Sequence, residues 1–474
     1  MKLFTISTEQ ILSGINSSFH NSRGGLWTIG STFNPFIAPS SGSSSGIGII
    51  NASPDFTDIS GAVVVDTPIG SVVDTTTGGT FLYITGDDGH FYKLDMSSDG
   101  APTDLRSGTP ITTPKEGMAI FQARGESQRY LYYFQNTQIG RWDLSGTHPT
   151  GWTDNHFTGL TNAIHITHRI FDRVYYTNGS KIGMIYDNGT SAAVNDVNVL
   201  DFEDDYIATT ISDDGQYFVA GITKNPNGLL GQSSTKVVFW DQNSGSWQRE
   251  WNIPAISISA IRNIGGIQYA VTPTGIYAFT FNSSPQLVQN VPTTLGSTVH
   301  NATDVYNEAI LIGNSTKTSS YGKMTPNVPT ALFNPYIHSG TAKLVLANAK
   351  IERLFVGTSS DKLYRANITS AGTSSSKAVT TAIDLKDRYT INRIRFTFAE
   401  PLASGDQMTV LAAPTPDSSL SGFGATNEIS FANKGAVRVA NLYSNLECES
   451  LLLDIAFTGL SIKQIDVYGE PTKT

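Results

Sequence analysis

The first residues to consider are those whose types could hold a metal ion. His165 and His168 form an H-x-x-H pair, and imidazole nitrogens are common zinc ligands. On a strand, residues three positions apart point to opposite faces, so we do not expect this pair to chelate one ion. The acidic run at residues 201–205 (DFEDD) offers oxygen ligands of the kind that calcium takes. It lacks the Asp-x-Asp-x-Asp-Gly spacing of a calcium loop, so a solvated loop is the preferred interpretation.

Signatures of catalysis are poor in this sequence. It contains no nucleophile elbow, phosphate loop, H-E-x-x-H or paired-carboxylate motif. The turn SDDG at residues 212–215 resembles one loose copy of the structural aspartate box of sialidases, without an identifiable arginine triad. We therefore expect a protein that is not an enzyme and needs no metal or cofactor. A hydrolase or lyase that acts on surface polysaccharide is the less favoured alternative.

Aromatic side chains suggest a second kind of chemistry, the stacking of sugar rings on indoles. Trp152, Trp247 and Trp251 lie in or near segments between strands, and they are the candidate glycan contacts. Trp142 and Trp240 fall within expected strands and are each followed by an aspartate. We expect those two to pack in the core.

A phrase of two short strands joined by a polar turn positions these residues and repeats along most of the chain. Clear copies are FLYITGDDGHFYKLD, YLYYFQNTQIGRWDL and RVYYTNGSKIGMIYD. Seven copies are anchored at Tyr83, Tyr133, Tyr176, Phe218, Tyr269, Ile310 and Phe355, with steps of 50, 43, 42, 51, 41 and 45 residues. This period, with several short strands in each unit, is typical of a β-propeller blade. One such sheet cannot bury both apolar faces alone, so we expect about seven blades stacked in a ring.

Composition agrees with an all-β protein and excludes several classes. Charged residues make up 15% of the 474, the chain has 44 glycines, and runs with a helical period are almost absent. The net charge is −9 and basic residues do not cluster, which argues against nucleic acid as a partner. No stretch approaches the roughly 18 apolar residues of a membrane span. Cys448 is the only cysteine, so no disulfide framework is expected, and the N-terminus is a poor signal peptide.

Four regions follow from these patterns. Residues 1–50 are a Gly/Ser-rich extended arm, 51–370 the propeller, 371–377 a flexible linker and 378–474 a small β-sandwich of jelly-roll type. The last region is predicted from seven short alternating strands: TTAIDL, RIRFTF, QMTVLAA, NEISFA, AVRVAN, SLLLDIAF and IKQIDVYG. The arm either lies on a neighbouring molecule or seals the propeller. Its aromatic residues Trp27, Phe33 and Phe36 are the candidate assembly contacts, because a free arm would gain nothing by exposing them.

This organisation resembles the structural proteins of tailed bacteriophages. The resemblance is carried by the arm GGLWTIGSTFNPF, by SPDFTDISG from Ser53, by the blade phrases QIGRWDLSG and VVFWDQNSGSW, and by the terminal sandwich. It implies a virion protein of a tail, tail tip, nozzle or fibre that is synthesised in the bacterial cytoplasm. It also implies contacts with other tail proteins and homo-oligomers around a symmetry axis. No coiled-coil or collagen-like shaft is present, which departs from fibre shafts.

Two functional hypotheses remain beside the enzyme. The first is a non-enzymatic component of a phage tail or its adhesion apparatus, with the propeller as a rigid platform for protein contacts. The alternative is a lectin-like module that binds glycan, including a host cell-surface glycan, through the propeller or the sandwich. The two are compatible in one protein. Neither requires nucleic acid, membrane insertion or a cofactor.

Overall fold

The computed structural model describes most of the chain. The described residues are 2–7, 26–28, 57–60, 66–98, 100–189, 192–203, 205–224, 234–273, 275–290, 298–306, 309–315, 317–321, 332–348, 350–351, 353–367, 376–380, 383–398, 400–413, 421–422, 428–460 and 462–472. They form two compact units. The first comprises Thr57–Thr316 with Ser339–Arg365, and the second comprises Met1–Phe56, Lys317–His338 and Ala366–Thr474.

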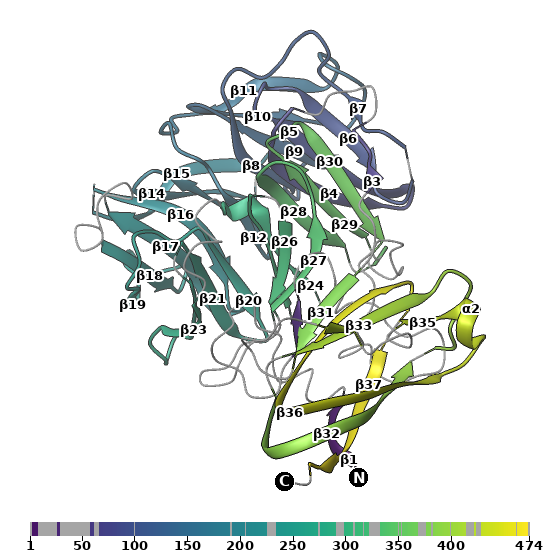
Figure 1. Ribbon diagram of the computed structural model, residues 1–474. Coiled ribbons are helices and arrows are strands. Elements are labelled where there is room, and N and C mark those ends of the chain that lie inside the picture. Colours follow the sequence, from purple (N-terminus) through teal and green to yellow (C-terminus); the bar gives the residue numbers. More distant parts are fainter. Residues whose placement is uncertain are drawn as a thin grey trace. The chain divides into compact units, whose positions relative to one another are not determined.

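Seven four-stranded antiparallel sheets make up the repeated part of the chain (Figure 1). We number them as blades 1 to 7 and give the strands of each from the centre outward. The first three are β4 (Pro68–Thr76), β5 (Gly79–Gly86), β6 (Phe91–Asp95) and β7 (Thr103–Asp104); β8 (Pro114–Phe121), β9 (Tyr130–Gln135), β10 (Gln138–Trp142) and β11 (Trp152–Thr158); and β12 (Thr167–Ile170), β13 (Arg173–Asn178), β14 (Lys181–Tyr186) and β15 (Val194–Asp201).

The remaining four blades follow the same order. They are β16 (Tyr206–Asp213), β17 (Phe218–Lys224), β18 (Ser234–Trp240) and β19 (Arg249–Asn252); β20 (Ala260–Ile264), β21 (Ile267–Thr272), β22 (Gly275–Phe279) and β23 (Gln286–Asn290); β24 (Thr303–Tyr306), β25 (Ala309–Gly313), β26 (Lys317–Tyr321) and β27 (Leu332–Ile337); and β28 (Ala342–Asn348), β29 (Arg353–Thr358), β30 (Lys362–Asn367) and β3 (Thr57–Asp58). The seven anchors predicted from the sequence all lie on the second strand of their blades.

The blades close into a ring, which makes the fold a β-propeller. The innermost strands of successive blades contact one another from β4 through β28, and β28 contacts β4. The last blade takes its outer strand from near the N-terminus, since β3 pairs antiparallel with β30. The phrase SPDFTDISG therefore supplies the strand that completes the ring. The expectation of about seven blades is confirmed.

Burial explains why the repeated phrase forms the middle of each blade. Strands β9, β13 and β21 are buried at every residue after the first, whereas the outer strands β11 and β19 have no buried residue. The apolar clusters described for the ring each join two neighbouring blades. Tyr132 and Phe134 of blade 2, for example, pack in one cluster with Val174 and Tyr176 of blade 3. Aromatic residues bury about 150–250 Å² each, so these contacts dominate the stability of the ring.

A glycine on the third strand makes room for the anchor tyrosine in two blades. Gly140 pairs with Tyr133 and Gly183 pairs with Tyr176. A β-carbon at either glycine would overlap the ring of the paired tyrosine. The motif Gln/Lys-Ile-Gly of the repeated phrase thus serves to seat an aromatic ring across the sheet.

Besides the outer strands β26 and β27 of blade 6, the second unit contains a nine-stranded arrangement around two long strands. These are β32 (Ile383–Phe398) and β36 (Val439–Thr458). The others are β1 (Lys2–Ser7), β2 (Leu26–Thr28), β31 (Ser376–Thr380), β33 (Gln407–Ala413), β34 (Ser421–Gly422), β35 (Glu428–Ser430) and β37 (Ile462–Pro471), with a short helix α2 (Phe431–Lys434). The first half of β36 pairs with β32 and its last residues pair with β31 and β33. Buried residues from all three of β32, β33 and β36 form one core.

Several expectations for this unit need correction. The predicted strands TTAIDL and RIRFTF overlap one strand, β32, and the predicted AVRVAN and SLLLDIAF overlap one strand, β36. The predicted strand NEISFA turns into helix α2 after Ser430, whose hydroxyl accepts a hydrogen bond from the backbone N–H of Asn433. This is an N-cap, which satisfies a free N–H at the start of the helix.

The described parts of the arm form strands in the second unit. Strand β1 pairs with β37, and β2, which contains Trp27, pairs with β31. Phe33 and Phe36 lie outside the described residues. The role of these three aromatic residues as assembly contacts stays a prediction.

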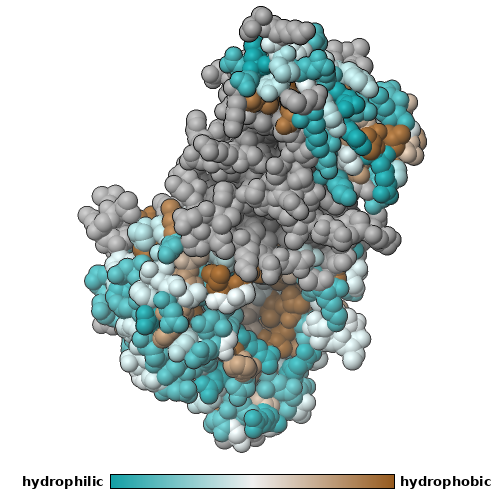
Figure 2. Space-filling model, turned by 90° about the horizontal axis from the view of Figure 1, so that it is seen from below, coloured by the Kyte–Doolittle hydropathy of each residue, from teal (hydrophilic) through white to brown (hydrophobic). Residues whose placement is uncertain are grey.

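The residues that are coloured on the face shown in Figure 2 are mainly hydrophilic, with smaller groups of hydrophobic residues. Large apolar side chains that are exposed in the described part of the chain include Phe171, Leu287 and Tyr443. Among the described residues, no helix has the length and apolar character needed to cross a membrane. Cys448 is buried, and burial raises the pKa of its thiol to about 11.

Candidate functional site

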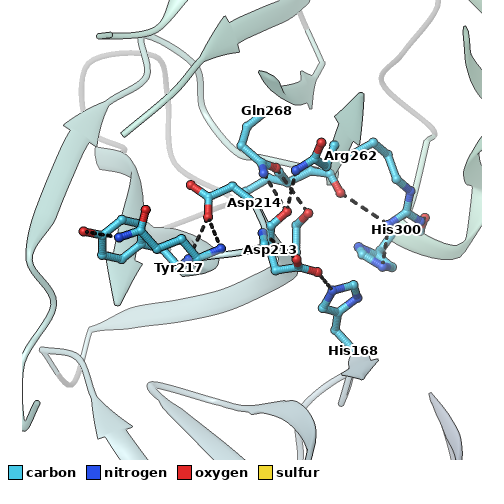
Figure 3. A network of polar contacts seen from close by, with 12 residues as sticks. His168, Asp213, Asp214, Tyr217, Arg262, Gln268 and His300 are labelled. Atoms are coloured by element: carbon cyan, nitrogen blue, oxygen red, sulfur yellow. Dashed lines mark hydrogen bonds and ion pairs between the residues drawn. The ribbon is translucent and has the colours of Figure 1, made fainter. Parts of the chain in front are cut away.

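Polar side chains link neighbouring blades around the ring. His168 Nε2 of blade 3 lies 2.6 Å from Asp213 Oδ2 of blade 4, and these two side chains face each other in Figure 3. The backbone carbonyl of Asp213 accepts hydrogen bonds from Asn263 Nδ2 and Gln268 Nε2 of blade 5, both at 2.7 Å. Arg262 of blade 5 donates to the carbonyl of Thr303 in blade 6 at 2.8 Å. Blades 3 to 6 are therefore joined in series.

The other blade junctions have links of the same kind. They are Thr167 Oγ1 to the Met118 carbonyl between blades 2 and 3, Ala347 N to Asp304 Oδ2 between blades 6 and 7, Thr67 Oγ1 to Asp361 Oδ1 between blades 7 and 1, and Arg129 to Asp74 between blades 1 and 2. Every junction of the ring thus carries at least one polar link besides its apolar packing. We call this set the polar belt.

A short 3-10 turn, η1 (His300–Ala302), reaches across the centre of the ring, and we call it the axial turn. It precedes blade 6, yet Asn301 Nδ2 donates to the carbonyl of Ile69 in blade 1 at 2.7 Å and to that of Glu116 in blade 2 at 3.2 Å. His300 Nδ1 lies 2.7 Å from Thr210 Oγ1 of blade 4. His300 and Asn301 of one turn thus contact blades on several sides of the axis.

Burial determines the protonation state of His300 in the axial turn. Desolvation, with the nearby Arg262 charge, holds the pKa of His300 well below its ordinary value, so the imidazole is neutral. Arg262 Nη1 lies 3.1 Å from His300 Nε2. Because a guanidinium only donates, Nε2 accepts and the proton sits on Nδ1, which donates to Thr210. Burial also raises the pKa of Asp304, against the opposing effect of Arg262.

A cavity of about 320 Å³ opens in blade 2, and we call it the blade 2 cavity. It lies between the loop that leads into β8, the turn between β9 and β10, and strand β11. Its lining residues are Arg106, Pro110, Ile111, Thr112, Thr113, Gln135, Asn136, Thr137, Gln138, Asp154 and Asn155. Pockets that bind small ligands begin at about 300 Å³, so the blade 2 cavity is of the size for a small molecule.

A fixed ion pair forms one wall of this cavity. Arg106 Nη1 and Nη2 lie 2.8 and 3.2 Å from the two carboxylate oxygens of Asp154. The hydroxyl of Tyr133 donates to Asp154 Oδ1, and the Gln135 amide donates to the backbone carbonyl of Asp154. Although burial acts in the opposite direction, the hydrogen bonds from Arg106 and Tyr133 hold the pKa of Asp154 below its ordinary value. The Asp154 side chain is 43% exposed, whereas that of Arg106 is 3% exposed.

The three candidate glycan tryptophans do not come together. Trp152 lies on β11 of blade 2, whereas Trp247 just before β19 and Trp251 on β19 both lie in blade 4 and pack against different apolar clusters. Trp152 stacks on Trp142, with ring centroids 4.8 Å apart, and the Arg106 guanidinium lies 4.9 Å from its ring. Trp247 packs beside Phe202 and donates from Nε1 to Glu250. The ring of Trp251 lies beneath Arg249 and its Nε1 donates to the carbonyl of Thr280. Their glycan role stays a prediction.

The tryptophans expected in the core have a local role as well. Trp142 Nε1 donates to the carbonyl of Ser145 at 2.8 Å, and Trp240 Nε1 donates to that of Ser244 at 2.6 Å. The aspartate that follows each tryptophan accepts hydrogen bonds from the same serine. The two Trp-Asp pairs therefore shape the turn that leaves the third strand.

The metal candidates take protein partners instead. His165 is buried between the carbonyls of Thr177 and Asn136, whereas His168 faces Asp213. In the acidic run, Asp201 pairs with Lys181 and Asp205 pairs with Lys224. Across the residues that the structure describes, no group of three or more His, Cys, Asp and Glu side chains is arranged to hold a metal ion.

Sequence reasoning missed both Asn301 and the blade 2 cavity. Asn301 lies in a segment without a repeat signal, and its partners are 185 and 232 residues away. The cavity is built from three segments of ordinary composition. The sequence carries one partial signal for the cavity. The turn in YLYYFQNTQIG of blade 2 differs from the turn in YYTNGSKIG of blade 3.

Comparisons with known proteins find only remote structural similarity. No family model matches the chain, and no curated protein matches it. The computationally designed Ika8 protein is similar at 9% identity and a TM-score of 0.40, covering 67% of this chain and 99% of that one. The Swd1 β-propeller domain from Myceliophthora thermophila is similar at 13% identity and a TM-score of 0.43, covering 62% of this chain and 96% of that one. The Pan2 WD40 domain from Neurospora crassa is similar at 10% identity and a TM-score of 0.44, covering 66% of this chain and 95% of that one. The likeness concerns the fold alone, and the chain is a β-propeller by its own sheet order and closed ring.

Proposed function

We propose that the protein is a non-enzymatic structural component of a bacteriophage tail or its adhesion apparatus, with the propeller as a rigid platform for other tail proteins. The observation that carries the proposal is the polar belt together with the axial turn. Polar side chains at the centre of the ring bond to one another and to backbone carbonyls of neighbouring blades. A platform needs such rigidity, whereas an enzyme needs groups free to meet a substrate.

The tail assignment is supported by the resemblance of the arm and blade phrases to phage structural proteins. It implies a place in the virion after synthesis in the bacterial cytoplasm, and assembly of several copies around a symmetry axis. We further propose that the second unit is a jelly-roll type sandwich. Its support is the single core shared by β32, β33 and β36. The arm, through Trp27, Phe33 and Phe36, is proposed to fasten the protein to its partners.

Electron microscopy of purified phage particles labelled at the C-terminus of this protein tests the tail role. We expect label at the tail or its tip with rotational symmetry. Particles that assemble and infect without any label would overturn the assignment. A second measurement is protease treatment of particles and of isolated protein. The arm should be cut faster in the isolated protein, and equal rates would count against its role in assembly.

Glycan binding is the second candidate function. One specific observation favours it, namely the blade 2 cavity with its convergent polar side chains. A polysaccharide-degrading activity has no comparable support. Incubation of the protein with host capsule should release no reducing ends, and their release would overturn the non-enzymatic proposal.

A further inference from the structure

The blade 2 cavity is best understood beside the same place in blade 3. Tyr133, Gln135 and Gly140 of blade 2 correspond to Tyr176, Asn178 and Gly183 of blade 3, because the two hairpins have the same register. In both blades an amide at the end of the second strand donates to a carbonyl of the outer strand: Gln135 to Asp154, and Asn178 to Val197. The two blades thus build the same turn.

The difference between the blades is what covers this turn. In blade 3, Thr161 donates to Asn178 Oδ1 from its backbone N–H at 2.7 Å and from its hydroxyl at 3.0 Å. The segment that leads into blade 2 takes another course, because β8 has a register shift between Pro114 and Met118 that β12 of blade 3 does not have. Thr112 of this segment lines the open blade 2 cavity. The loop that closes the turn in blade 3 leaves it accessible in blade 2.

Two features of the cavity show unused capacity for a ligand. Asn136 Oδ1 is a buried acceptor without a hydrogen-bond partner among the described residues, and such atoms are uncommon in native proteins. Thr113, opposite it, has a φ of 52°, and its carbonyl accepts from the backbone N–H of Asn136 at 2.9 Å. A non-glycine residue in this conformation is strained, and strain of this kind gathers at binding sites.

The charges of the cavity select a neutral ligand. An anion would meet the Asp154 carboxylate, and a cation would meet the Arg106 guanidinium, which already neutralise each other at 2.8 Å. The remaining lining groups are amides and hydroxyls of Gln135, Asn136, Thr137 and their neighbours. Amides, hydroxyls and one carboxylate suit a molecule with several hydroxyl groups, each of which both donates and accepts.

We propose that the blade 2 cavity binds a saccharide through its hydroxyl groups. The exposed Asp154 carboxylate is one acceptor, the Asn136 side chain turns on binding so that its buried Oδ1 becomes a second acceptor, and Gln138 and Asn155 lie at the rim. Trp152 does not contact the ligand in this proposal. It stacks on Trp142 and supports the Arg106 guanidinium, which forms part of the cavity wall. This inference gives a site and a ligand class to the second candidate function. It does not depend on the tail role, so its failure would leave the particle microscopy unaffected.

The test is a binding measurement with the full chain and four variants. Saturation-transfer NMR is followed by titration with glucose, galactose, N-acetylglucosamine and rhamnose, with inorganic phosphate and choline as the anionic and cationic probes. Thr137→Trp fills the cavity from its exposed rim, and Ser180→Trp places the same side chain at the corresponding position of blade 3. Asn136→Ala removes the unpartnered acceptor without removing a side-chain hydrogen bond of the fold. Trp247→Ala tests a sugar platform elsewhere.

We expect at least one sugar to bind to the wild type, to Ser180→Trp and to Trp247→Ala, and not to Thr137→Trp. Asn136→Ala should weaken binding by about three- to tenfold, the effect of one lost hydrogen bond. If the natural ligand is a polymer, a surface polysaccharide that contains the sugar should compete with the free sugar for the cavity. If the natural ligand is a free sugar, the polysaccharide should not compete. The proposal is overturned if no sugar binds, if Thr137→Trp binds like the wild type, or if phosphate or choline binds in place of the sugars.

Discussion

The side-chain amide of Asn301 donates a hydrogen bond of 2.7 Å to the backbone carbonyl of Ile69, which lies 232 residues earlier in the chain. The same nitrogen lies 3.2 Å from the carbonyl of Glu116. One side chain of the axial turn thus connects blade 6 with blades 1 and 2. This contact should contribute to the stability of the whole ring, because it joins segments that only the closed propeller brings together.

Asn301→Ala should lower the free energy of unfolding by about 1–3 kcal/mol, since it leaves two carbonyls near the axis without their donor. The measurement is urea unfolding followed by tryptophan fluorescence. Asn162→Ala, at an exposed position, serves as the control and should stay within about 0.5 kcal/mol of the wild type. Equal stability of the two variants would contradict the role of the axial turn.

Gly183→Ala should destabilise the protein by about 1–3 kcal/mol or more, because the added β-carbon overlaps the ring of Tyr176. Gly140→Ala should behave in the same way through Tyr133. Gly245→Ala is the matched control, since a β-carbon there meets nothing within 4 Å. Thermal unfolding of the three variants measures these differences in stability. If Gly183→Ala and Gly245→Ala melt together, the glycine does not seat the ring.

Glu116 should make the stability fall between about pH 4.5 and pH 7. Burial raises the pKa of its carboxyl from 4.5 to about 7, against the opposing charges of Lys115 and Lys343. In this range the folded protein binds more protons than the unfolded chain, so stability decreases as the pH rises. The loss amounts to at most about 3 kcal/mol once the carboxyl is ionised.

Glu116→Gln is the variant that tests this contribution. It should lose the corresponding part of the pH dependence and be more stable than the wild type at pH 8. Urea unfolding at pH 5 and pH 8 measures both. An unchanged difference between the two pH values would show that another group is responsible.

Cys448 should react with a thiol reagent only when the second unit opens. It is buried, and burial raises the pKa of its thiol to about 11, so little thiolate exists at neutral pH. The labelling rate in native buffer should be far below the rate in urea. Labelling in native buffer at the rate of a free thiol would mean that this part of the core is open.

The repeat made the ring predictable, and long-range pairing made the rest unpredictable. Tyr133 and Tyr176 recur with the same turn and glycine, so the blades could be placed from the sequence. Asn301 and β3 find their partners about 200–300 residues away, and no local pattern encodes those contacts. Strands β32 and β36 each continue through polar residues, which in the sequence resemble turns.

The candidate site was less predictable than the fold for a related reason. The sequence predicts Trp152 in or near a segment between strands as a candidate glycan contact, but its ring stacks on Trp142 and lies next to the Arg106 guanidinium. The blade 2 cavity depends on the absence of a contact that Thr161 makes in blade 3. A missing contact leaves no mark in composition or spacing.

A crystal structure of the isolated protein at side-chain resolution tests the central claim most directly. The account predicts seven blades, with β3 as the outer strand of blade 7 and the Asn301 amide bonded to the carbonyls of Ile69 and Glu116. A ring with another number of blades, or an axis in which residues 300–302 do not bridge the blades, would contradict it.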